Sequence, residues 1–184
     1  MARPLAGGRA EPGAAARQDD EQARDQLHDQ PVGLRARVTT TSAAETIDLG
    51  RRLGRVAAAG DLVCLWGDLG AGKTQLAKGL ALGLGIDATV NSPTFILMAE
   101  YPGRLPLFHV DLYRLADAAD ALAGGVIDDR QAEGLTVVEW PDRMGALLPS
   151  DRLDIRIDGS ADEPRTIALT ATADAYRRYV EAVR

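Results

Sequence analysis

The sequence predicts an α/β fold: a three-layer sandwich around a phosphate-binding loop, with a mostly parallel central sheet and antiparallel edge strands. The segment "LWGDLGAGKTQLAKGL", residues 65–80, places a glycine-rich loop after an apolar run and before a helical pattern. Further apolar runs alternate with helical stretches, as in sheets that carry helices on their faces. Runs that follow each other without a helix between them predict antiparallel strands.

The elements can be placed along the chain from local signals. Ser42 with Glu45 three residues later predicts the start of a helix, and Gly60 predicts its end. Residues 61–67 are typical of a buried strand, and residues 73–85 of a helix. The remaining predicted elements are two strands within 92–114 that turn at Pro102 and Gly103, a polar helical stretch at 117–134, strands at 135–140, 152–159 and 165–172, and a closing helix at 174–184.

Length and charge narrow the class of protein. The 184 residues hold one domain of ordinary size, at residues 36–184, after an N-terminal tail at 1–35. The tail has almost no large apolar residues, so we expect it to be disordered. The 27 acidic and 21 basic side chains give a formal net charge of -6, unlike a protein that grips a polyanion unaided. We therefore expect a partner to hold any nucleic acid involved.

The cysteine count and the hydropathy pattern indicate the cellular compartment of the protein. The chain has one cysteine, Cys64, inside the apolar run "DLVCLW", so an internal disulfide is excluded. The N-terminal residues lack the apolar core of a signal peptide, and no stretch approaches the roughly 18 apolar residues of a membrane span. We expect a cytoplasmic protein that does not contact a membrane.

The loop from Gly67 to Thr74 has the spacing G-x-x-x-x-G-K-[ST] of a nucleotide phosphate loop, or P-loop. Its glycines let backbone N–H groups turn toward a phosphate, and the following helix points its positive end at the anion. Lys73 supplies a charge for the β- and γ-phosphates, and Thr74 supplies a hydroxyl for Mg²⁺. Since the chain has no N-K-x-D segment that reads guanine, ATP is favoured over GTP. The residues predicted to bind nucleotide in this loop are Gly67, Asp68, Leu69, Gly70, Ala71, Gly72, Lys73, Thr74 and Gln75.

Two carboxylates follow apolar runs and are candidates for the metal and for catalysis. Asp111 ends "PLFHVD" and Glu139 ends "LTVVE". The carboxyl ends of parallel strands meet at the sheet edge where ligands bind, so either acid can serve as the second anchor of Mg²⁺. Each can instead cap the element that follows it.

Other candidates lie near these motifs. The segment "NSPTF", with Ser92, Pro93 and Thr94, is either a loop that senses the γ-phosphate or a plain turn. His109 is either a base or a packing residue.

Three more side chains are possible interface residues. Tyr113 and Trp140 are core or interface residues in preference to base-stacking platforms. Arg114 is either an arginine finger or part of a surface ion pair.

Four segments together resemble one family. "GDLGAGKT", "SPTF", "HVDLYRL" and "VVEWPDR" occur in the order and approximate spacing of the bacterial tRNA threonylcarbamoyladenosine biosynthesis ATPases, TsaE. The resemblance covers residues from about 39 to 158. It implies a single-domain P-loop ATPase that uses ATP and Mg²⁺.

The resemblance also implies partners. TsaD would transfer a threonylcarbamoyl group to the adenosine beside the anticodon of certain tRNAs, and TsaB would assist it. The ATPase would hydrolyse ATP to reset this machinery between turnovers, so it would meet tRNA only indirectly, through the complex.

Residue roles follow from the same resemblance. Lys73 and Thr74 match the family's phosphate-loop residues, and Glu139 matches its magnesium ligand. Asp111 matches the aspartate of the "HxDLYR" motif, which we assign to orienting the attacking water. The matched switch residues are Ser92, Pro93 and Thr94, and the residues expected near the adenine lie within Thr41–Ala43 and include Ser42 and Ala43.

Two other functions use the same loop. A small-molecule kinase needs an arginine-bearing lid, for which "DDRQAEG" is the only candidate segment. A non-hydrolysing switch binds ATP only to gate a partner. A pure switch needs a metal ligand but no water-orienting acid, so the pair Asp111 and Glu139 separates it from an ATPase.

Overall fold

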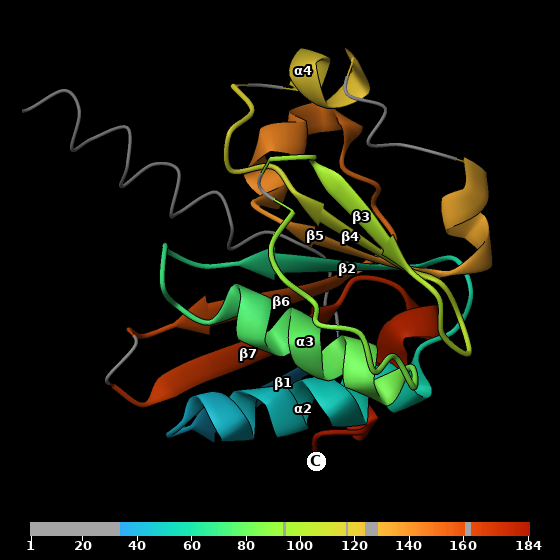
Figure 1. Cartoon of the computed structure of the whole chain (residues 1–184). Coiled ribbons are helices and arrows are strands. Elements are labelled where there is room, and N and C mark those ends of the chain that lie inside the picture. Colours follow the sequence, from blue (N-terminus) through green and yellow to red (C-terminus); the bar gives the residue numbers. More distant parts are fainter. Residues whose placement is uncertain (1–33, 94, 117, 124–128, 161–162) are drawn as a thin grey trace, which may run out of the picture. The chain divides into compact units, whose positions relative to one another are not determined.

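Within the residues that the computed structural model of this chain describes, seven strands form one sheet, in the order β1-β7-β6-β2-β5-β4-β3 (Figure 1). The structure describes residues 34–93, 95–116, 118–123, 129–160 and 163–184. The strands are β1 Leu34–Thr40, β2 Asp61–Trp66, β3 Met98–Tyr101, β4 Leu107–Asp111, β5 Leu135–Glu139, β6 Leu153–Asp158 and β7 Arg165–Ala171. The α-helices are α2 Ala43–Val56, α3 Lys73–Gly83, α4 Ala118–Ala123 and α5 Arg177–Glu181, and the 3₁₀ helices are η2 Asp129–Glu133, η3 Pro141–Leu147 and η4 Asp174–Tyr176.

The centre of the sheet is parallel and its edges are antiparallel, as predicted. Strand β2 pairs in parallel with both β5 and β6, and β5 pairs in parallel with β4. Strand β3 at one edge, and β7 and β1 at the other, run antiparallel to their neighbours. The parallel strands β2, β4 and β5 therefore end at one edge, where the loops that follow them meet.

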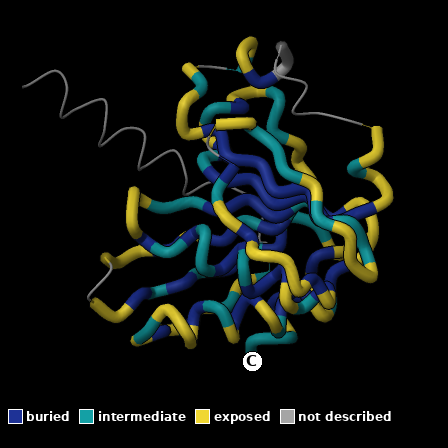
Figure 2. Tube along the Cα trace, in the orientation of Figure 1, coloured by how far each residue is buried: buried dark blue, intermediate teal, exposed yellow. Residues whose placement is uncertain are grey.

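Helices lie on both faces of the sheet. Leu53 of α2 and Leu80 of α3 belong to one large core cluster with Val63 of β2 and with side chains of α5. On the opposite face, Met144 of η3 packs against strand residues such as Val138 in a second, smaller cluster. Figure 2 shows the buried residues concentrated along the central strands, between these layers. The three-layer arrangement is confirmed.

Helices α2 and α3 touch through their backbones. A Cβ atom at Gly54 would overlap the carbonyl oxygen of Leu80, and one at Gly79 would overlap that of Ile47. Gly50 and Gly83 extend the same contact. Without side chains between them, the helix that follows the phosphate loop and the helix that precedes β2 pack with their backbones in direct contact.

Several predicted boundaries were wrong. The tail was expected to reach residue 35, but Leu34 and Arg35 begin β1; the rest of the predicted tail, residues 1–33, lies outside the described residues. The predicted 117–134 helix is divided into α4 and η2, with 117 and 124–128 outside the described part. Neither β1 nor η3 was expected from the sequence. Within the described ranges, no helix is long and apolar enough to cross a membrane.

Candidate functional site

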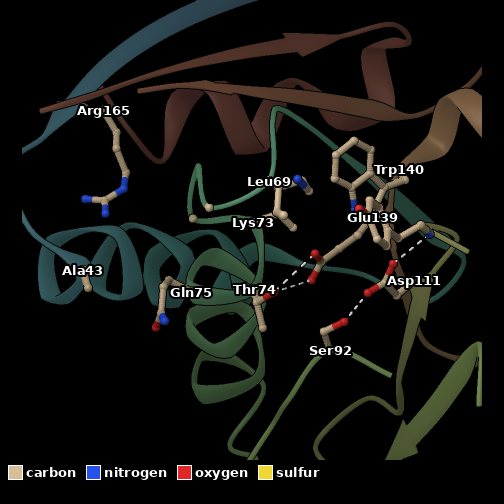
Figure 3. Close-up of a pocket in the computed structure, with 13 residues that line it drawn as sticks. Ala43, Leu69, Lys73, Thr74, Gln75, Ser92, Asp111, Glu139, Trp140 and Arg165 are labelled. Carbon is tan, nitrogen blue, oxygen red and sulfur yellow. Dashed lines mark hydrogen bonds between the residues drawn. The ribbon is translucent and has the colours of Figure 1, made fainter. Parts of the chain in front are cut away.

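The phosphate loop connects β2 to α3 and forms one wall of a cavity of about 490 Å³ (Figure 3). Gly67 has a φ of 145°, and a Cβ atom there would lie 2.5 Å from the Ile157 carbonyl oxygen. Gly72 has a φ of 113° and caps α3 without a side chain. Both positions require glycine, and they leave the N-terminus of an eleven-residue helix open to an anion.

The cavity gathers most of the predicted site residues. The residues that line it are Ala43, Leu69, Gly70, Gly72, Lys73, Thr74, Gln75, Ser92, Asp111, Tyr113, Glu139, Trp140 and Arg165. Figure 3 shows Thr74, Ser92, Asp111 and Glu139 close together, with Ala43, Gln75 and Arg165 toward the other end. We call these the phosphate end and the base end, after the parts of the nucleotide that we expect there.

Lys73 is buried and turned back on its own loop. Its Nζ atom donates hydrogen bonds to the carbonyl oxygens of Gly67, at 2.6 Å, and Asp68, at 2.9 Å. The same atom lies 3.9 Å from the centre of the Trp140 ring, a cation–π contact. Burial lowers the pKa of Lys73, while Glu139 and Asp111 act in the opposite direction. The ammonium group is therefore held where a phosphate would approach.

Glu139, at the end of β5, is the centre of a buried hydrogen-bond chain. The Thr74 hydroxyl donates to Oε1 of Glu139 at 3.0 Å, with Oε2 at 3.3 Å. Within the buried core, Nε2 of His109 lies 2.9 Å from the same Oε1 atom of Glu139. His109 is fully buried and does not line the cavity, so it is a hydrogen-bonded core residue and cannot act as a base on a ligand there.

Asp111, at the end of β4, connects the SPT segment to the site. The Ser92 hydroxyl donates to Oδ2 of Asp111, and the backbone N–H of Tyr113 donates to Oδ1 at 2.9 Å. Asp111 pairs with Glu139 across the β4–β5 ladder, which puts the two carboxylates side by side at the sheet edge. Pro93 is buried, and Thr94 lies outside the described residues.

The two aromatic candidates both line the cavity. Tyr113 and Trp140 contact each other with ring centres 5.1 Å apart. Trp140 has a φ of 61°, uncommon for so bulky a residue, and this backbone turn lets its ring lie over Lys73. Arg114 lies over the ring of Phe95, which is 83% exposed, and Arg114 does not line the cavity.

The base end includes a residue that was not expected from the sequence. Arg165, the first residue of β7, is buried, and its Nε atom donates to the Ala71 carbonyl oxygen at 3.0 Å. Its side chain lines the cavity with Ala43 and Gln75. Nothing in the run "RTIALTAT" marks this arginine, because its position depends on an antiparallel strand that tertiary structure brings to the loop.

Four predicted nucleotide-binding residues lie beside the cavity lining. Gly67, Asp68 and Ala71 shape the loop through their backbones, and their carbonyl oxygens accept hydrogen bonds from Lys73 and Arg165. Ser42 caps α2 by accepting from the Glu45 N–H at 3.1 Å, as the capping pattern predicts.

The donor groups fit a magnesium ion better than a metal held by protein alone. In the described part of the chain, no three His, Cys, Asp or Glu side chains gather into a metal-binding group. Mg²⁺ beside a nucleotide takes one or two protein oxygens and fills its other positions with phosphate and water. The Thr74 hydroxyl and the Glu139 carboxylate, already in contact, supply two such oxygens.

Comparison with known proteins agrees with these features. The family model described as "Threonylcarbamoyl adenosine biosynthesis protein TsaE" matches residues 40–167. The protein named tRNA threonylcarbamoyladenosine biosynthesis protein TsaE from Bacillus subtilis is 41% identical over 143 residues, covering 77% of this chain and 89% of that protein. The protein of the same name from Treponema pallidum is 42% identical over 133 residues, covering 72% of this chain and 98% of that protein.

A solved structure extends the likeness to the fold. The crystal structure of Bacillus subtilis YdiB superposes with a TM-score of 0.68 at 35% identity, covering 83% of this chain and 95% of that one. The phosphate loop, the two strand-end carboxylates and the SPT segment all lie within the matched residues. On this ground, the chain belongs to the TsaE family.

Proposed function

We propose that this chain is a Mg²⁺-dependent ATPase in the biosynthesis of tRNA threonylcarbamoyladenosine, working with TsaD and TsaB. The observation that carries the proposal is the convergence of Lys73, Thr74, Asp111 and Glu139 on one end of the phosphate-loop cavity. The names of the relatives support the pathway. The acidic net charge of -6 supports indirect contact with tRNA through the partners.

Binding of the triphosphate uses the loop and its lysine. Backbone N–H groups at the start of α3 face the anion, and the helix dipole favours negative charge there. Lys73 turns from the carbonyl oxygens of Gly67 and Asp68 to the phosphate oxygens. At the base end, Ala43, Gln75 and Arg165 border the space for the nucleoside. We expect ATP in preference to GTP.

Hydrolysis uses the two strand-end carboxylates for different tasks. When bound, Mg²⁺ neutralises phosphate charge and fixes the geometry of the phosphate oxygens. Thr74 and Glu139 would hold the ion through the hydroxyl and carboxylate that contact each other in this structure. Asp111 orients the attacking water and accepts its proton. The Ser92 hydroxyl, which bonds to Asp111, connects that step to the SPT segment.

The decisive experiment measures ATP hydrolysis by the purified chain with Mg²⁺, alone and with TsaB and TsaD. Stimulation by the partners that Asp111→Ala removes supports the proposal. Phosphate transfer to a small acceptor without the partners points to a kinase. Tight ATP binding without hydrolysis in either mixture points to a non-hydrolysing switch, and both of these outcomes contradict an ATPase.

Two variants test the site residue by residue. Lys73→Ala removes the phosphate counter-charge, so we expect ATP binding to be lost, and unchanged affinity would refute the assignment. Lys78→Ala is the matched control, because Lys78 lies on the same helix and does not line the cavity. Glu139→Ala should keep some binding but lose Mg²⁺-dependent turnover. Wild-type turnover in the Glu139→Ala variant would indicate that Asp111 is the metal ligand instead.

A further inference from the structure

His109 is a buried polar residue that the proposed mechanism does not use. It lies on β4, paired with Val137 of β5 on one side and Ala99 of β3 on the other. Its side chain is fully buried and does not line the cavity. A purely apolar side chain would fill this place without bringing polar atoms into the core, so the imidazole needs a separate explanation.

The two ring nitrogens of His109 are in unequal surroundings. Nε2 lies 2.9 Å from Oε1 of Glu139. A carboxylate has no hydrogen to give, so Nε2 carries the hydrogen of this bond and donates it. Nδ1 is buried and has no hydrogen-bond partner among the described residues. Within that part of the chain, the bond to Glu139 is thus the one hydrogen bond of this ring.

Glu139 is held from two directions. Its Oε1 atom accepts from His109 inside the sheet and from the Thr74 hydroxyl on the cavity side. A carboxylate at the end of a strand can otherwise turn about its last bond, since that torsion is broad. The bond from His109 fixes this rotation and leaves Oε2 as the oxygen that His109 does not engage.

We propose that His109 is the positioning residue for the metal-binding carboxylate: its Nε2–H orients Glu139, so that Mg²⁺ binds a preset oxygen. This inference rests on the proposed function, because it assumes that Glu139 binds Mg²⁺. Residues that orient ligands in this way alter metal affinity by about 10–100-fold when they are replaced. Because His109 does not line the cavity, its effect should appear in the Mg²⁺ dependence of nucleotide binding.

The test compares His109→Met, which removes the donor at similar volume, with His109→Gln, which keeps an N–H at similar reach. A fluorescent ADP analogue is titrated into each protein in EDTA, and then at increasing Mg²⁺. We expect affinity in EDTA within about twofold of wild type for both variants. In His109→Met, the half-saturating Mg²⁺ concentration should be about 10-fold or more above the wild-type value. In His109→Gln, it should lie within about threefold of the wild-type value.

Controls separate positioning from packing and from the metal assignment itself. Val110→Ala removes buried volume from the same strand on the opposite face, so it should leave the Mg²⁺ dependence unchanged. If Glu139→Ala shifts the Mg²⁺ dependence and His109→Met does not, the inference about His109 fails while the proposed metal site stands. If Glu139→Ala itself leaves the Mg²⁺ dependence unchanged, the proposed metal site fails. If His109→Met loses the same affinity for the ADP analogue with and without Mg²⁺, His109 has only a structural role.

A spectroscopic measurement on the wild-type protein keeps the inference testable even if His109→Met does not fold. Nitrogen-15 NMR of the histidine side chains should show a hydrogen on Nε2 of His109 that exchanges slowly with water and shifts in Glu139→Gln. An Nε2 atom without a hydrogen, or one that is insensitive to Glu139→Gln, would overturn the inference.

Discussion

The Ser92 hydroxyl donates a hydrogen bond to Oδ2 of Asp111, which joins the SPT segment to the end of strand β4. The other carboxylate oxygen accepts the backbone N–H of Tyr113 at 2.9 Å. Asp111 therefore lies between the segment that precedes β3 and the turn that follows β4. A movement of the Asp111 carboxylate would therefore alter its bonds to both segments.

Asp111→Asn should lower ATP turnover by about 100-fold or more, with a nucleotide affinity within a few-fold of wild type, because an amide neither orients nor deprotonates water as well. Ser92→Ala should lower turnover less, since it removes a contact of the carboxylate and not the carboxylate itself. Single-turnover hydrolysis measures both. Ser150→Ala is the matched control, because it removes an exposed serine–aspartate bond elsewhere. Equal turnover in wild type and Asp111→Asn would exclude the assigned role.

The contact between α2 and α3 predicts a stability effect. In Gly54→Ala the new methyl group would overlap the Leu80 carbonyl oxygen, so the helices must separate. We expect a loss of about 1–3 kcal/mol or more in the free energy of unfolding, measured in urea. Gly85→Asn is a suitable control, because Gly85 has a φ of 76° that asparagine tolerates and no atom would lie within 4 Å of its Cβ. Similar losses in both variants would contradict the packing argument.

One buried acid bonds to two side chains of the C-terminal helix α5. Asp61, at the start of β2, accepts from the Tyr179 hydroxyl at 2.6 Å and forms an ion pair with Arg178. Asp61→Asn should lower the free energy of unfolding by about 2–4 kcal/mol, because it leaves Arg178 without its counter-charge. Thermal melting measures the loss. Asp48→Asn, which breaks an exposed ion pair, should leave the melting temperature unchanged. A melting temperature for Asp61→Asn equal to that of wild type would contradict this account.

Lys73 should make stability depend on pH in a defined direction. Burial lowers the pKa of Lys73 from its usual 10.5, so the unfolded chain holds this proton more tightly than the folded one. The charge opposes folding below the folded-state pKa, and the penalty disappears as the pH rises toward 10.5. The free energy of unfolding of nucleotide-free wild type, relative to Lys73→Met, should therefore rise from neutral pH to 10.5. Urea titrations at several pH values measure this difference in free energy of unfolding. A difference that stays constant or falls with pH would show that burial does not dominate the pKa of Lys73.

The parts predicted correctly are those with a local signal. The strands β2, β4 and β5 are short apolar runs, and an acid after such a run lies at the sheet edge wherever the strand is parallel. That rule is enough to place Asp111 and Glu139 in one cavity from the sequence alone. The capping of α2 by Ser42 was likewise readable, because it depends on residues three positions apart.

The parts that the sequence did not reveal depend on contacts between distant segments. Strand β1 alternates arginines with smaller residues, a weak local signal, and in the structure it pairs with β7 along its whole length. Arg165 reaches the phosphate loop from 94 residues away, and the bond between His109 and Glu139 spans 30 residues. No local sequence pattern predicts these contacts, because they depend on strand order and register.

Three polar side chains of the phosphate end have partners within the chain: Lys73 on the loop carbonyls, Thr74 on Glu139, and Ser92 on Asp111. If the site binds ATP, as we propose, the nucleotide must compete with these internal partners for the three side chains. Its affinity is therefore only the difference between the hydrogen bonds that it forms and the internal ones that it breaks. If the chain hydrolyses ATP, as we propose, the same internal partners would bind these side chains again as the products leave. For the proposed ATPase, such a site would favour rapid exchange of nucleotide over long retention.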